Sequence, residues 1–135
     1  FTSHSEQDTV KIGYNLAKEL KKGDIVAFYG DLGVGKTAFI RGIADCFGIT
    51  EIASPTFTIV NEYNGSVTIY HFDAYRINSV DWLACGFDED LFGNGICLIE
   101  WAENIESVLP DGTIRVKISK NTDIDYDYRN IEVEK

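Results

Sequence analysis

The apolar residues of the stretch 9–20 recur at three- and four-residue intervals: Ile12, Leu16, Ala17 and Leu20. This spacing predicts an amphipathic helix, for which Ser5 or Asp8 is the expected cap. Gly13 argues slightly against it, because glycine costs about 1 kcal/mol relative to alanine inside a helix.

A strand and a second helix are predicted next. Residues 25–29, Ile-Val-Ala-Phe-Tyr, form a continuous apolar run that stops at Gly30, as expected of a strand buried on both faces. Residues 38–47 are helical in pattern, and Gly48 is their expected stop. A glycine-rich loop therefore lies between a buried strand and a helix.

The rest of the chain is rich in predicted strands. Residues 57–63 and 67–72 are separated by Asn64-Gly65, whose tolerance of positive φ predicts an antiparallel hairpin. Residues 96–99 resemble another buried strand, while 113–119 and 128–133 alternate in polarity and can form a second hairpin.

The order of these elements predicts the fold class. No repeat, low-complexity tract or Pro/Gly-rich linker interrupts the sequence. We therefore expect a single domain over residues 1–135, an α/β sandwich. Its central sheet should be parallel near the glycine-rich loop and antiparallel elsewhere, with flanking helices.

Charge and composition narrow the function classes. Twenty-two acidic against twelve basic residues give a net charge of -10, which repels polyanions, so contact with nucleic acid is expected to be local or relayed by a partner. No apolar run approaches the roughly 18 residues of a membrane span, and the first residues do not resemble a secretory signal. We expect a cytoplasmic protein without a membrane segment.

The three cysteines are too few and too scattered to suggest a metal or disulfide framework. Cys46, Cys85 and Cys97 are an odd number, and each has an apolar or small neighbour. They are interpreted as reduced thiols in or near the core.

The glycine-rich loop carries the clearest chemistry. It consists of Gly30, Asp31, Leu32, Gly33, Val34, Gly35, Lys36 and Thr37. Its glycines permit backbone conformations that turn several N–H groups inward, forming an anion site at the positive end of the next helix. Lys36 can reach the β- and γ-phosphates of a nucleotide, and the Thr37 hydroxyl can enter the shell of Mg²⁺.

Such a loop is a P-loop, and between a buried strand and a helix it predicts an α/β fold of the P-loop NTPase type. A P-loop enzyme also needs a carboxylate at the end of a neighbouring strand. Two residues compete for this role: Glu100 ends the better buried strand, whereas Asp73 ends a strand of alternating pattern. We favour Glu100 as the Mg²⁺ ligand and Asp73 as a residue that positions water, although either acid can instead be solvated or structural.

Other residues are ambiguous by themselves. The segment Ser54-Pro55-Thr56-Phe57-Thr58 can close over a γ-phosphate, but it can equally be an ordinary turn before a strand. For four aromatic or basic residues, a role in packing or at the surface explains the residue as well as a functional role does: His71, Tyr75, Arg76 and Trp101.

Three segments that follow the P-loop resemble one family when taken together. They are Ser54-Pro55-Thr56-Phe57-Thr58-Ile59-Val60, His71-Phe72-Asp73-Ala74-Tyr75-Arg76 and Ile99-Glu100-Trp101-Ala102-Glu103. Their order and approximate spacing resemble the TsaE family, also known as YjeE, over about residues 8 to 115. The resemblance implies an ATPase subunit of the bacterial machinery that places threonylcarbamoyl on an adenosine of tRNA, acting with protein partners and touching tRNA only indirectly.

The resemblance also implies roles for particular residues. Thr37 and Glu100 would hold Mg²⁺. Asp73 would be needed for hydrolysis, and Thr56 would lie near the γ-phosphate. Together with Lys36, which the loop itself places at the phosphates, they are the candidate catalytic residues. Trp101 would lie close to the nucleotide and Thr9 near its adenine.

One departure from the family is Ala38, where many relatives have a second threonine. The backbone N–H of Ala38 can still serve the α-phosphate. The stretch after Lys120 carries no motif of the family.

Two other functions remain open from the sequence. The same loop serves small-molecule kinases and regulatory GTPases, but the sequence contains no Asn-Lys-x-Asp segment for guanine. Arg76 is the only arginine between Arg41 and Arg115, so an arginine-rich kinase lid is not evident. A nucleotide-sensing adaptor that binds but hardly hydrolyses is a third possibility.

Overall fold

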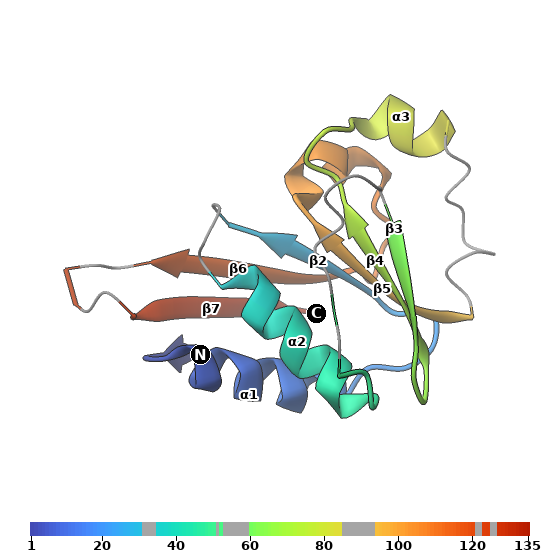
Figure 1. The fold of residues 1–135 in the computed structure, drawn as a ribbon. Helices are drawn as coiled ribbons and strands as arrows, with labels where there is room; N and C mark the ends of the chain where they lie inside the picture. The colour runs from blue at the N-terminus through green and yellow to red at the C-terminus, as the bar shows by residue number, and fades with distance from the viewer. Residues whose placement is uncertain (31–34, 51, 53–59, 85–93, 121–122, 125–126) are drawn as a thin grey trace.

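A mixed sheet of seven strands forms the centre of the molecule, in the part of the chain that the structure describes (Figure 1). The computed structural model describes residues 1–30, 35–50, 52, 60–84, 94–120, 123–124 and 127–135. The strands are β1 (Thr2–Ser3), β2 (Ile25–Tyr29), β3 (Val60–Asn64), β4 (Thr68–Asp73), β5 (Gly95–Glu100), β6 (Ile114–Lys120) and β7 (Arg129–Glu134). Their order across the sheet is β1-β7-β6-β2-β5-β4-β3.

The centre of this sheet is parallel and its edges are antiparallel. β6, β2, β5 and β4 run in the same direction, whereas β7 and β1 at one edge and β3 at the other pair antiparallel. The expected α/β class with a mixed sheet is therefore confirmed. Because the carboxyl ends of the parallel strands meet at one edge, the residues that follow β2, β4 and β5 lie close together.

Helices cover both faces of the sheet (Figure 1). α1 (Glu6–Ala17) and α2 (Lys36–Cys46) pack on one face, and α3 (Ser79–Ala84) and the 3₁₀ helix η1 (Ala102–Val108) lie on the other. The apolar run of β2 is continuous because both faces of this strand are buried. Val26 and Phe28 contribute to the core under α1 and α2, while Ile25 and Ala27 contribute to the core under α3 and η1.

Two glycines allow α1 and α2 to approach closely. A Cβ on Gly13 would lie 2.2 Å from the carbonyl oxygen of Phe39, and one on Gly42 would lie 2.0 Å from that of Val10. No side chain fits at such distances. The glycine that argued against the first helix is therefore required by the packing of that helix on α2.

The bounds of α1 differ from the prediction of residues 9–20. The helix begins at Glu6, because the Ser5 hydroxyl accepts a hydrogen bond from the Asp8 N–H at 3.1 Å and caps its first turn. It ends at Ala17, although Leu20 beyond it is still buried. The hydrophobic periodicity predicted the buried face of this segment correctly. It did not predict the residues at which the helix begins and ends.

Both predicted hairpins are present. β3 pairs with β4 and β6 pairs with β7, each in antiparallel register. The reason given for the first turn was wrong, since neither Asn64 nor Gly65 has positive φ. Gly65 is needed for space, because a Cβ there would lie 2.2 Å from the carbonyl oxygen of Phe47.

Two of the three cysteines lie in or near the core, as predicted. Cys97 is fully buried, and burial raises the pKa of its thiol well above the usual value. Cys46 is partly buried against the core, and Cys85 lies outside the described residues. Both described thiols are free. Within the same part of the chain, none of the helices combines the length and apolar character that a membrane span requires.

Candidate nucleotide site

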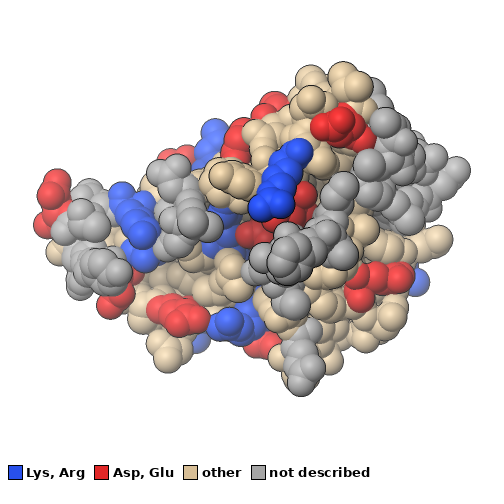
Figure 2. Space-filling model, turned by 45° about the horizontal axis from the view of Figure 1, so that its top comes forward, with Lys and Arg blue, Asp and Glu red and all other residues tan. Residues whose placement is uncertain are grey.

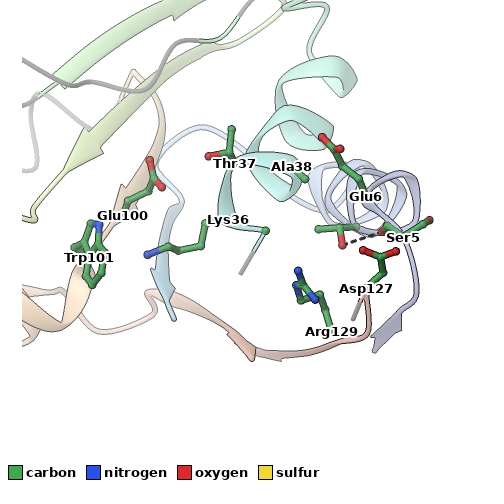
Figure 3. Close-up of a pocket in the computed structure, with 11 residues that line it drawn as sticks. Ser5, Glu6, Lys36, Thr37, Ala38, Glu100, Trp101, Asp127 and Arg129 are labelled. Atoms are coloured by element: carbon green, nitrogen blue, oxygen red, sulfur yellow. Dashed lines mark hydrogen bonds between the residues drawn. The ribbon is translucent and has the colours of Figure 1, made fainter. Parts of the chain in front are cut away.

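A cavity of about 340 Å³ opens at the N-terminus of α2 (Figure 3). Its lining consists of Ser5, Glu6, Thr9, Gly35, Lys36, Thr37, Ala38, Glu100, Trp101, Asp127 and Arg129. These residues come from the two ends of the chain, from the start of α2 and from the end of β5. The fold thus brings together residues far apart in sequence around the start of one helix.

The glycine-rich loop has the strand and the helix that its motif requires. β2 ends at Tyr29, directly before Gly30, and α2 begins at Lys36. Gly35 precedes α2 in the left-handed conformation, with φ 110° and ψ 15°, which a side chain rarely adopts. The first N–H groups of a helix have no partner within it, so this end of α2 suits an anion. Asp31, Leu32, Gly33, Val34 and Thr56 lie outside the described residues.

The Lys36 side chain crosses the cavity toward the end of β5 (Figure 3). Its ammonium donates to the carbonyl oxygen of Gly30 at 2.8 Å and lies 3.9 Å from the centroid of the Trp101 ring. Only 5% of the residue is exposed. A buried ammonium in a cavity next to a helix N-terminus is an electrostatic feature that favours an anionic ligand.

Trp101 has an unusual backbone conformation. With φ 58° and ψ 39°, it is the one residue other than glycine with positive φ in the described part of the chain. Bulky residues seldom adopt this conformation. The turn directs the chain from β5 into η1 and brings the indole against both Lys36 and Tyr75, whose ring centroid is 4.9 Å away. Strain of this kind is typical of functional sites.

Thr37 and Glu100 face the same part of the cavity. Thr37 extends from the first turn of α2 and Glu100 from the last position of β5, and Figure 3 shows the hydroxyl and the carboxylate directed toward the space between them. The Glu100 side chain is 12% exposed. Its Oε2 lies 2.7 Å from Nε2 of His71, a buried residue of β4. Sequence reasoning had left His71 unassigned.

Asp73 lies beside Glu100 without lining the cavity. The two acids are register partners at the ends of the parallel strands β4 and β5. Oδ1 of Asp73 accepts a hydrogen bond from the Tyr75 N–H at 2.9 Å, so this carboxylate also shapes the turn that follows β4. The structure therefore brings both competing acids to one edge of the sheet, with Glu100 closer to the cavity.

Thr9 also lines the cavity, at the first turns of α1. It is 2% exposed, and its hydroxyl is 2.7 Å from that of Ser3. Ser5 and Glu6, at the start of the same helix, join it in the lining. The first helix therefore forms one wall of the cavity.

Asp127 and Arg129 complete this wall and were not predicted. They lie just before and at the start of β7, at the end of the cavity near Ser5 and Glu6 (Figure 3). No motif marks them in the sequence. They reach the cavity because β7 pairs with both β6 and β1, which places this stretch beside the start of α1.

A cluster of polar side chains joins the end of β2 to η1 and β6. The hydroxyl of Tyr29 donates to Oε2 of Glu106, while Arg115 Nη2 lies 2.9 Å from Oε1 of the same carboxylate. Burial and the neighbouring Glu106 raise the pKa of Tyr29 to about 12, and the hydrogen bond from Tyr29 lowers the pKa of Glu106. This cluster ties η1, which begins after Trp101, to β2 and β6.

Comparisons with known proteins identify a family and a structural relative. The family model for the threonylcarbamoyl adenosine biosynthesis protein TsaE matches residues 3–131. The crystal structure of YdiB from Bacillus subtilis superimposes with a TM-score of 0.76 at 36% sequence identity, covering 97% of this chain and 80% of that chain. This neighbour has the P-loop NTPase fold expected here.

Curated relatives share this family name, and the alignments with them cover most of their length. The tRNA threonylcarbamoyladenosine biosynthesis protein TsaE of Treponema pallidum is 42% identical over 118 residues, which cover 86% of this chain and 87% of that protein. The proteins of the same name from Bacillus subtilis and Rickettsia conorii are 43% and 45% identical, each covering 87% of this chain and respectively 75% and 69% of their own. The chain therefore belongs to the TsaE family of threonylcarbamoyl adenosine biosynthesis proteins.

Proposed function

We propose that this protein binds ATP with Mg²⁺ and hydrolyses it, and that it acts on the protein partners that modify tRNA with threonylcarbamoyl. The observation that carries the proposal is the cavity at the start of α2, where Lys36, Thr37 and Glu100 meet. A cation, a hydroxyl and a carboxylate beside a helix N-terminus are the groups that a nucleoside triphosphate and its metal require.

The phosphates would lie along the start of α2. There the first N–H groups of the helix and the ammonium of Lys36 supply positive charge from two directions. In the present structure Lys36 contacts Gly30 and Trp101, so this side chain would turn toward the phosphates when the nucleotide binds. The wall formed by Thr9 and Arg129 would then lie toward the nucleoside end.

The chemistry of the donors fits Mg²⁺. Thr37 offers a hydroxyl oxygen and Glu100 a carboxylate oxygen, and Mg²⁺ binds few such protein oxygens because it keeps waters and phosphate oxygens in its shell. When bound, the metal would neutralise charge that develops on the phosphates. Thr37 and Glu100 would hold it from the two sides of the cavity.

Asp73 is the proposed residue for hydrolysis. It ends the strand next to that of Glu100, within reach of the same edge of the sheet. A carboxylate there would orient the attacking water, while Lys36 would stabilise charge on the transferred phosphate. Thr56 remains a proposed contact of the γ-phosphate and lies outside the described residues.

The charge of the protein supports action through partners. Figure 2 shows acidic side chains interspersed with the basic ones on one face, where no continuous basic stripe crosses the described surface. Neutralising several tRNA phosphates would require such a stripe. With a net charge of -10, the chain is expected to approach tRNA only within a protein complex.

A turnover assay tests the proposal directly. The purified chain should hydrolyse ATP slowly, and the other proteins of the threonylcarbamoyl-transfer complex should accelerate it, whereas free tRNA should not. Lys36→Ala should abolish turnover. Lys18→Ala, at a solvent-exposed position of the described surface, is the matched control and should behave as the parent. Binding without any turnover, alone or with partners, would instead indicate a nucleotide-sensing adaptor.

Binding of labelled tRNA tests the second half of the proposal. At about 150 mM salt, where charge interactions are screened beyond roughly 8 Å, the isolated chain should bind tRNA weakly. Retention of tRNA should require the partner proteins. Submicromolar affinity of the chain alone would contradict an indirect role.

A further inference from the structure

The hydrogen bond between His71 and Glu100 links the cavity to a buried residue outside it. The side chain of His71 is 3% exposed, and its Nε2 lies 2.7 Å from Oε2 of Glu100. In the sheet His71 is the register partner of Leu98, two residues before Glu100. The imidazole therefore reaches forward along the strands to contact the carboxylate at the end of β5.

The chemistry of the pair defines the direction of this hydrogen bond. An ionised carboxylate only accepts, so Nε2 of His71 carries the proton and donates it. Nδ1 of His71 is buried and has no hydrogen-bond partner within the described residues. A proton on Nδ1 would be a buried donor without an acceptor, which is unfavourable. The hydrogen bond from Nε2 to Glu100 is thus the contact that the position of the imidazole ring provides.

This bond leaves one oxygen of Glu100 available to the cavity. In the described part of the chain, Oε2 is held by His71, and Oε1 has no side-chain partner. A carboxylate with one oxygen anchored can no longer rotate between equivalent positions without breaking that bond. The second oxygen of Glu100 is therefore the one left for a ligand in the cavity that Glu100 and Thr37 line.

From this geometry we infer that His71 is a positioning residue, which orients Glu100 as a ligand of the nucleotide-bound Mg²⁺. The inference rests on the proposed function, because it concerns the metal of that site. Residues that hydrogen-bond to a metal ligand orient it, and their loss usually weakens metal affinity by roughly 10- to 100-fold.

Packing alone does not account for a histidine here. The ring lies 6.2 Å from that of Tyr63 and fills space next to the core. An apolar side chain of similar size would fill that space and would leave no unpartnered Nδ1. What an apolar residue cannot supply is the N–H that holds Glu100.

Two variants separate positioning from packing. His71→Leu removes the donor and keeps an apolar side chain, whereas in His71→Gln the amide nitrogen extends about as far as Nε2 did. The affinity for Mn²⁺, a spectroscopic substitute for Mg²⁺, is measured by electron paramagnetic resonance in the presence of ATP. ATP affinity is measured separately by calorimetry in EDTA.

The expected result is a selective loss of metal affinity. His71→Leu should bind Mn²⁺ at least roughly tenfold more weakly, and His71→Gln should stay within a factor of about three of the parent. ATP affinity in EDTA should be unchanged in both. Ile69→Val, a buried change on the same strand that does not touch Glu100, should leave both affinities unaltered.

Other outcomes overturn the inference. Unchanged Mn²⁺ affinity in His71→Leu would show that Glu100 needs no anchor, and equal losses with and without metal would show a structural role. If His71→Leu does not fold, His71→Asn replaces it, because its amide is polar but too short to reach Oε2, and it should lose metal affinity equally. Failure of the parent itself to bind Mn²⁺ with ATP would instead contradict the proposed function.

Discussion

The ammonium of Lys36 lies 3.9 Å from the centroid of the Trp101 ring, a cation–π contact between the first residue of α2 and the residue that follows β5. The contact places an indole against the charge that is proposed to bind phosphate. The electrons of the ring face attract the ammonium of Lys36. A nucleotide would compete with the ring for the same positive charge.

Nucleotide binding should therefore be visible in the fluorescence of Trp101. Adding ATP with Mg²⁺ should change the emission as Lys36 leaves the ring. The chain has two tryptophans, so Trp82→Phe should keep the change and Trp101→Phe should lose it. An identical change in Trp101→Phe would show that the signal arises elsewhere.

Lys36→Ala should weaken ATP binding by a factor of ten or more, because hydrogen bonds to charged groups contribute roughly 1.5–3 kcal/mol. Calorimetry measures the affinity, and circular dichroism checks that the fold is retained. Equal ATP affinity of the variant and the parent would show that Lys36 does not bind the nucleotide.

Glu100→Ala and Asp73→Ala should have different effects. Loss of Glu100, which lines the cavity, should weaken Mg²⁺-dependent nucleotide binding. Loss of Asp73 should mainly slow turnover at saturating ATP, because its role is in the chemical step. Titration with Mg²⁺ and steady-state kinetics distinguish the two. Metal affinity lost with Asp73→Ala but kept with Glu100→Ala would mean that the roles are exchanged.

Arg129→Gln should lower ATP affinity by roughly a factor of ten, since it removes a guanidinium from the cavity lining. The matched control is Lys135→Gln, which removes a charge of the same sign from an exposed pair with Glu19. Calorimetry should show a change only for Arg129→Gln. The same result for both variants would indicate a general effect of net charge.

Gly13→Ala should destabilise the protein although alanine is the better helix former. The gain in helix propensity is about 1 kcal/mol, but a Cβ would meet the Phe39 carbonyl oxygen at 2.2 Å and push α1 away from α2. We expect a net loss of about 1–3 kcal/mol in the free energy of unfolding, measured with urea. Asn15→Ala, at an exposed position of α1, should be neutral or slightly stabilising.

Tyr29 should make stability fall at high pH. Its pKa is raised from 10.0 to about 12 in the folded protein, so the folded state binds the proton more tightly than the unfolded state does. That stabilisation is complete below pH 10 and is lost as the pH rises through about 12. Urea unfolding over this range should show a smaller decline for Tyr29→Phe than for the parent. Equal declines would mean that other groups dominate.

The sequence by itself determined the elements whose signals are local. The apolar run at 25–29, the glycines and the Lys36-Thr37 pair predicted a strand, loop and helix at a phosphate site, and the structure shows that strand and helix. Such features depend on contacts within a few residues, so a short stretch of chain contains the information.

Tertiary structure decided which distant residues meet. Arg129 lines the cavity because β7 pairs with β6 and β1, and His71 reaches Glu100 because β4 and β5 are parallel neighbours in one register. Gly13 is explained only by the approach of α2. Strand order, register and helix packing are set by burial across the whole chain, and a one-residue shift in register would turn each side chain to the other face of the sheet.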